Sequence, residues 1–179
     1  MMRQRRSAFL VPFGGLLLAA AQITAGAQQR EFRPLFDGTL AEPIVVEGPP
    51  GAASALKMCY AAWTKGRTAM LLGVRALAKA EGVDGALAAE WERSLPGLHE
   101  DSEKASVRVS PKAWRWEGEM QEIAAAFEAA GLPGGFHHAA AELYAAMAVF
   151  KDGGAEDFQA VMDAVLGDAV LEKAKTDPI

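Results

Sequence analysis

The sequence predicts an all-α protein of about five helices, arranged around one long N-terminal helix with a short strand before it. The long helix is predicted because about thirty residues after residue 51 contain no proline and are rich in alanine and leucine. Apolar residues then recur at helical spacing in later segments, with short glycine and proline breaks between them. The β-like run at residues 43–46 stands alone, and a lone strand cannot form a sheet.

The long helix opens from a tight turn and carries a seam of small residues. Residues 48–51 read Gly-Pro-Pro-Gly, and Gly82 is expected to end the helix. Each glycine in the seam lowers helix propensity by roughly 1 kcal/mol, so close packing should offset it. The packed partner is either another helix of this chain or a second chain. The seam consists of Ala62, Gly66, Ala69, Gly73 and Ala76.

Four further helices follow from breaks and apolar spacing. Asp84 is expected to cap the second helix, and Ser110 with Pro111 should form the N-cap and first position of the third. Residues 97–110 are polar without helical periodicity, so we predict a surface loop there. The expected buried stripes are Trp116, Met120, Ile123 and Phe127; Phe136, Ala140, Leu143, Met147 and Phe150; and Phe158, Val161, Met162 and Val165.

Composition excludes several classes of function. The formal net charge of −5 and the pI near 5.3 leave no basic footprint, so no nucleic-acid partner is expected. Cys59 is the only cysteine and is interpreted as a buried, inert thiol. The adjacent His137 and His138 would point about 100° apart on a helix and could not easily chelate one ion, so no metal is expected.

The N-terminus has two interpretations. A basic start, an apolar run and Ala25-Gly26-Ala27 together resemble a secretory signal over residues 1–27. The alternative is an N-terminus unrelated to export, such as a misassigned start.

Two segments carry a resemblance to a known family. The string GPPGAASALKMCYAAWTKG fits the pattern G-x-G-x-x-x-K-x-x-x-N at Gly51 and Lys57, while Ala53 and Ala61 replace the second glycine and the asparagine. Residues 112–144 resemble a K-D-x-x-x-A helix and its successor. These strings resemble the C-terminal helical domain of the 6-phosphogluconate dehydrogenase and β-hydroxyacid dehydrogenase superfamily, closest to a branch known mainly as phosphogluconate dehydrogenase.

The resemblance implies roles for four residues. Lys57 would be the catalytic acid/base, exchanging a proton with a substrate hydroxyl or carbonyl while hydride moves to or from NADP or NAD. Gly51, Ser54 and Lys112 would contact substrate, although Ser54 is equally a helix cap and Lys112 equally a solvated charge. Ala113 replaces the aspartate that follows the lysine in relatives.

The resemblance also implies a domain organisation. Residues 51–179 would be the helical domain and 30–50 the remnant of a nucleotide-binding domain. Residues 1–29 would be a signal-like or non-native N-terminus. No G-x-G-x-x-G turn is present, so no NADP or NAD is expected to bind this chain alone. A truncated, cytoplasmic protein is therefore favoured, with export through residues 1–27 as the alternative.

The functional expectation follows from these assignments. The chain would be the substrate-binding and dimerisation domain of an NAD(P)-dependent oxidoreductase, inactive alone. Its substrate would be a small hydroxy acid, sugar acid or imine, and its partner a second copy in a homodimer. The alternative is a non-enzymatic helical binding or assembly module.

Overall fold

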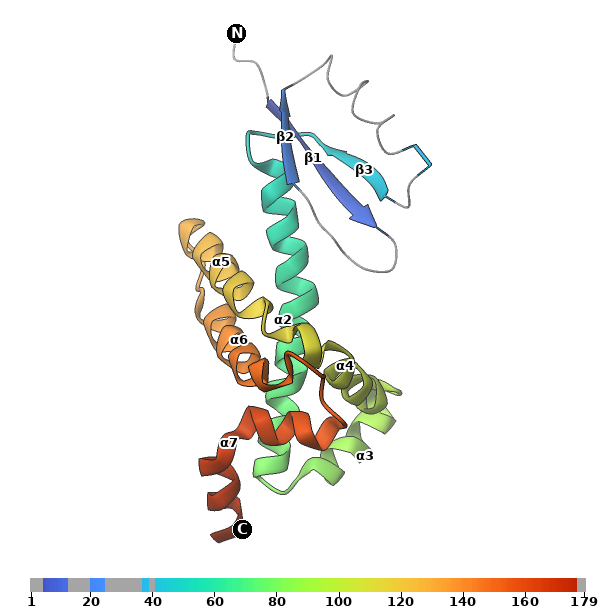
Figure 1. The fold of residues 1–179 in the computed structure, drawn as a ribbon, viewed down its shortest axis with the longest axis vertical. Helices are drawn as coiled ribbons and strands as arrows, with labels where there is room; N and C mark the ends of the chain where they lie inside the picture. Colours follow the sequence, from blue (N-terminus) through green and yellow to red (C-terminus); the bar gives the residue numbers. More distant parts are fainter. Residues whose placement is uncertain (1–4, 13–19, 25–36, 39–40, 177–179) are drawn as a thin grey trace. The chain divides into compact units, whose positions relative to one another are not determined.

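The computed structural model describes residues 5–12, 20–24, 37–38 and 41–176 (Figure 1). The chain divides into two compact units, residues 1–61 and 62–179. Helix α2 (Ala52–Ala80) begins in the first unit and continues into the second.

The first unit contains a three-stranded antiparallel sheet in the order β2-β1-β3. Its strands are β1 (Arg5–Pro12), β2 (Ala20–Thr24) and β3 (Ala41–Val46). Ser7 pairs with Val46 on one side of β1, and Arg5 pairs with Thr24 on the other. The predicted run 43–46 therefore lies in β3, but the expectation of a lone strand is wrong. The signal-like segment supplies β1 and β2, and β1 pairs with the backbone of β3.

Helix α2 begins and ends at glycines with left-handed backbone, as the sequence predicted. Gly51 has φ +93° immediately before the helix. At the other end Gly82 has φ +66°, the Val83 amide donates to the Ala78 carbonyl at 2.9 Å, and the Gly82 amide donates to the Lys79 carbonyl. These two bonds form a Schellman motif and satisfy carbonyls that the helix end leaves free.

The second unit is helical, which confirms the predicted all-α class. Six α-helices, α2 to α7, lie in the part of the chain that the structure describes, against the predicted five. Gly167 interrupts α7 with a non-helical backbone. After α2 they are α3 (Asp84–Ser94), α4 (Leu98–Ala113), α5 (Trp116–Ala129), α6 (Gly135–Ala146) and α7 (Phe158–Thr176), with the 3₁₀ helix η2 (Met147–Phe150) after α6.

Helix α4 is the extra helix, and the prediction of a loop at residues 97–110 is wrong. Its buried face is made of small residues, three of them serines spaced four apart, so it has no apolar periodicity to detect. Each serine hydroxyl donates to a carbonyl of its own helix, which satisfies the buried oxygen. The buried face comprises Ser102, Ser106, Val109, Ser110 and Ala113.

Ser110 and Pro111 lie inside α4, so the prediction that they start a helix is wrong. Pro111 has no N–H, so the Val107 carbonyl one turn earlier loses its normal helical donor. The Ser110 hydroxyl donates to that carbonyl at 2.9 Å and accepts the Ala155 amide at 2.7 Å. Ser110 thus replaces the donor that Pro111 lacks and connects α4 to the segment before α7 by a hydrogen bond.

We expect Ser110→Ala to lower the free energy of unfolding by about 2–4 kcal/mol, because it leaves a part-buried carbonyl and a part-buried amide without partners. Ser94→Ala is the matched control: its hydroxyl also donates to a carbonyl of its own helix, but it is exposed. The control should cost no more than about 0.5 kcal/mol. Equal losses in urea titrations of the two variants would contradict this role of Ser110.

The small-residue seam of α2 packs against α6. A Cβ added at Gly66 would lie 3.0 Å from Cε1 of Phe136, and one added at Gly73 would lie 3.5 Å from Cδ1 of Leu143. Ala69 and Ala76 in the same seam are buried. Of the two partners predicted for the seam, the structure therefore shows a helix of the same chain.

The predicted core stripes are confirmed in part, because seven of their thirteen residues are buried. Trp116, Phe127, Leu143, Phe150 and Val165 are half-buried, and Phe136 is exposed. Cys59 is also exposed, so its interpretation as a buried thiol is wrong. No helix among the described residues is long and apolar enough to cross a membrane. The stripe residues that are fully buried are Met120, Ile123, Ala140, Met147, Phe158, Val161 and Met162.

Candidate functional site

The first two turns of α2 hold three of the four predicted site residues. Gly51 forms the turn, and its carbonyl accepts the Ala55 amide at 2.9 Å. Ser54 is exposed, and Lys57 is half-buried. No acidic residue lies in the first turn, so the positive end of the helix dipole is not neutralised from within that turn.

Lys57 lies on one face of α2 between two buried alanines. Ala53 precedes it by four residues and Ala61 follows it by four, which places all three on one side of the helix. Both alanines are at most 2% exposed. They occupy the positions where the resembling family has its second glycine and its asparagine.

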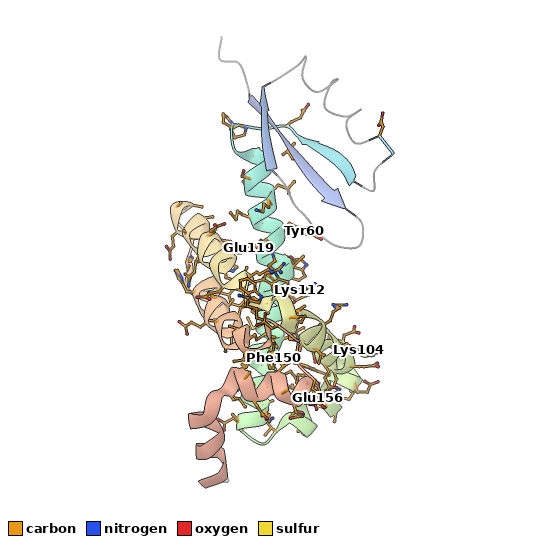
Figure 2. All side chains as sticks on the ribbon, in the orientation of Figure 1. Tyr60, Lys104, Lys112, Glu119, Phe150 and Glu156 are labelled. Carbon is orange, nitrogen blue, oxygen red and sulfur yellow. The ribbon has the colours of Figure 1, made fainter. Side chains whose placement is uncertain are left out.

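Lys112 belongs to the second unit and lies in the last turn of α4, exposed to solvent (Figure 2). It was expected in the first turn of a helix, where a cation is mildly unfavourable. That expectation is wrong, because α4 begins at Leu98 and continues past Pro111. A cation at a helix C-terminus is favourable, so the position of Lys112 by itself does not indicate a bound anion. Ala113, which follows Lys112, is fully buried.

A cluster that the sequence did not predict joins α2, α5 and α6. Lys65 is part-buried, pairs with Glu119 and lies 5.5 Å from the centre of the Trp116 ring. The Tyr144 hydroxyl donates to the Lys65 carbonyl at 2.6 Å. Burial raises the pKa of Tyr144 well above its ordinary value, so this phenol stays protonated and acts as a donor. The cluster therefore holds three helices together.

A second unpredicted cluster surrounds Arg75, whose side chain is 1% exposed. Its Nε donates to Asp84 at 2.8 Å, Nη1 to the Ser102 hydroxyl at 2.9 Å, and Nη2 to Glu103 at 3.1 Å. The guanidinium also lies 4.3 Å from the centre of the Phe158 ring. Arg75 thus connects α2 with α3, α4 and α7. Asp84 lies in the first turn of α3 and makes no capping bond, contrary to expectation.

The two adjacent histidines of α6 have different surroundings. His137 is buried, its ring centre lies 4.4 Å from that of Phe127, and its Nδ1 has no hydrogen-bond partner in the described structure. Burial, and then the charge of His138, lower the pKa of His137. His138 contacts Gln121 at 2.6 Å and Glu128 at 3.0 Å. Among the residues placed by the structure, no group of three or more potential ligands could hold a metal ion.

Comparison with known proteins gives one partial match. A family model described as a domain of unknown function (DUF1932) matches residues 78–147, from the end of α2 to the first residue of η2. The matched segment includes Lys112 but not Lys57. Neither a curated protein nor a solved structure matches the chain.

Proposed function

We propose that this chain is the substrate-binding and dimerisation domain of an NAD(P)-dependent oxidoreductase similar to 6-phosphogluconate dehydrogenase. The observation that supports it most is the start of α2. A left-handed glycine leads into a long helix, and a half-buried lysine follows one to two turns later, between the buried Ala53 and Ala61. This is the local geometry in which a lysine amine can reach a substrate oxygen at the mouth of a turn.

In this proposal Lys57 is the acid/base group for a substrate hydroxyl or carbonyl. The Ser54 hydroxyl and the backbone at Gly51 would position the substrate. The nicotinamide supplies the hydride when bound by a nucleotide-binding domain. No G-x-G-x-x-G turn occurs in these 179 residues, so the proposal assigns these three residues only the substrate side of the reaction.

The test is a ligand screen of the full chain by saturation-transfer NMR. The probes are gluconate, 6-phosphogluconate, a short 3-hydroxy acid, and NADP. We expect transfer to at least one hydroxy acid or sugar acid and none to NADP. Binding of NADP alone, or of none of the organic acids, would contradict the proposal.

A homodimer is the second part of the proposal, and an exposed apolar face of α2 supports it. Trp63, Met70 and Leu77 repeat every seven residues and are 65%, 50% and 63% exposed. The Arg67 guanidinium lies 5.8 Å from the centre of the Trp63 ring. Seven-residue spacing of large apolar residues suits packing against another helix, and tryptophan, methionine and arginine are enriched at interfaces. The same face would serve the alternative function, a non-enzymatic helical assembly module.

We expect the double change Trp63→Ser and Met70→Ser to weaken self-association at least about tenfold, because it removes two large apolar side chains from the contact. Sedimentation velocity over a concentration series measures this. Val149→Ser is the matched control, since Val149 is 75% exposed but lies on η2. A wild-type chain that stays monomeric throughout, or a double variant that associates as well as the control, would contradict dimerisation through this face.

A further inference from the structure

The turn between α4 and α5 places two cations against one indole ring. Trp114 follows the last residue of α4. The Lys151 ammonium lies 4.5 Å from the centre of the Trp114 ring, and the Arg115 guanidinium lies 5.4 Å from it. Lys151 comes from the end of η2, so the ring brings together cations from two separate parts of the second unit.

The pairing of cations in the second unit is uneven. Five of the lysines and arginines that the structure describes in this unit have a carboxylate partner within ion-pair distance. Among the described residues, no ion pair joins a carboxylate to Arg108, Lys112, Arg115 or Lys151, although exposed acids such as Glu117 and Asp152 are close in the chain. Of the five described lysines and arginines of this unit that have no ion pair, four therefore lie on α4 or directly after α4 or η2, and the fifth, Arg67, lies on α2. The five paired cations are Lys65, Arg75, Lys79, Arg93 and Lys104.

The helix dipole explains only part of this distribution. Lys112 in the last turn of α4 complements the negative helix end, but Lys151 is on another element. The indole Nε1 of Trp114 is also buried and has no hydrogen-bond partner in the described structure. A buried donor without an acceptor costs free energy, so an arriving acceptor would be favoured there.

We propose that Arg115, Lys151 and Trp114 form a binding site for a phosphate group, such as that of a phosphate monoester. The guanidinium and the ammonium neutralise two negative charges, and Lys112 and Arg108 add long-range attraction. The indole ring holds both cations in place and so reduces the side-chain entropy lost on binding. The site does not use Lys57 and stands independently of the proposed reaction.

Inorganic phosphate is the probe, added to the full chain at about pH 7.5, where it carries close to two negative charges. The indole N–H signal of Trp114, assigned with Trp114→Phe, is followed by ¹H–¹⁵N NMR. We expect saturable movement of this signal, with binding weakened at least about tenfold in the Arg115→Gln and Lys151→Gln double variant. Acetate and chloride at matched ionic strength should move it less.

Arg67→Gln provides the matched control. Arg67 also lies against an indole ring, that of Trp63, and among the described residues it has no ion pair with a carboxylate. It should bind phosphate as the wild type does. The proposal is overturned if phosphate causes no saturable shift, if chloride reproduces the shift, or if the double variant and the control respond equally. Gluconate and the short 3-hydroxy acid of the ligand screen carry no phosphate, so their responses are independent of these outcomes.

Discussion

Arg75→Ala should lower the free energy of unfolding by about 3–5 kcal/mol, because it breaks a buried charge network and leaves a cavity. The side chain is 1% exposed and bonds three residues on two helices, so no other group can take its place without rearrangement. Urea unfolding followed by circular dichroism measures the loss.

Two further variants separate charge from packing at this position. Arg75→Met keeps most of the volume and should lose less than Arg75→Ala, because burying a well-packed apolar chain offsets part of the lost pairing. Arg93→Ala removes a 75% exposed arginine that pairs with Glu90 on its own helix, and should change stability by no more than about 0.5 kcal/mol. A loss below about 1 kcal/mol in Arg75→Ala would contradict a connecting role for this residue.

Tyr144→Ala should have an effect of similar size, about 3–5 kcal/mol, because the ring is fully buried and lies edge-on to Trp116 at 5.1 Å. Tyr144→Phe keeps the ring and removes only the hydrogen bond to the Lys65 carbonyl, so it should cost about 1 kcal/mol. Similar losses in the two variants would show that the ring packing contributes little.

Tyr144 also predicts how stability changes at alkaline pH. Burial raises its pKa in the folded chain, while in the unfolded chain the phenol titrates near its usual value of about 10. Above that pH the unfolded state loses the proton and the folded state keeps it. This contribution to stability is therefore complete below about pH 10 and is lost as pH rises towards the folded pKa, by up to about 1.4 kcal/mol per pH unit.

The comparison is between wild type and Tyr144→Phe in urea titrations between about pH 9 and pH 11. The phenylalanine variant should lose less stability across this interval, because it has no phenol to ionise at position 144. Parallel pH curves for the two proteins would contradict burial of a neutral phenol here. Tyr60, the other tyrosine, is exposed and is present in both proteins.

The long helix could be predicted from sequence because its signals are local. Gly51 and Gly82 mark its ends through their own backbone conformations, and the small residues between them require close packing whatever the partner. Helix α4 could not be predicted in this way. Its serines are buried because each hydroxyl bonds its own helix, which composition alone cannot reveal.

The clusters around Lys65 and Arg75 depend on contacts between residues far apart in the sequence. Local sequence patterns therefore could not predict them. In the sequence Arg75 resembles an ordinary charge on a helix surface. In the structure it contacts Asp84, Glu103 and Phe158, which lie on three other helices. One signal was available: Arg75 lies between Leu72 and Ala76 on the face that packs inward. The predicted site at Lys57 differs from these clusters. Its assignment rests on the spacing of a sequence motif, and its ligand stays a prediction.

The start of α2 carries the central functional claim, and one titration tests it most directly. The hydroxy acid or sugar acid that gives the strongest NMR response is titrated by calorimetry into wild type, Lys57→Ala and Lys104→Ala. Lys104 is an exposed lysine paired with Glu100 on α4, and serves as the control. We predict that Lys57→Ala weakens binding at least about tenfold while the control binds normally. Equal affinity in all three proteins would contradict the assignment of Lys57 to a substrate site.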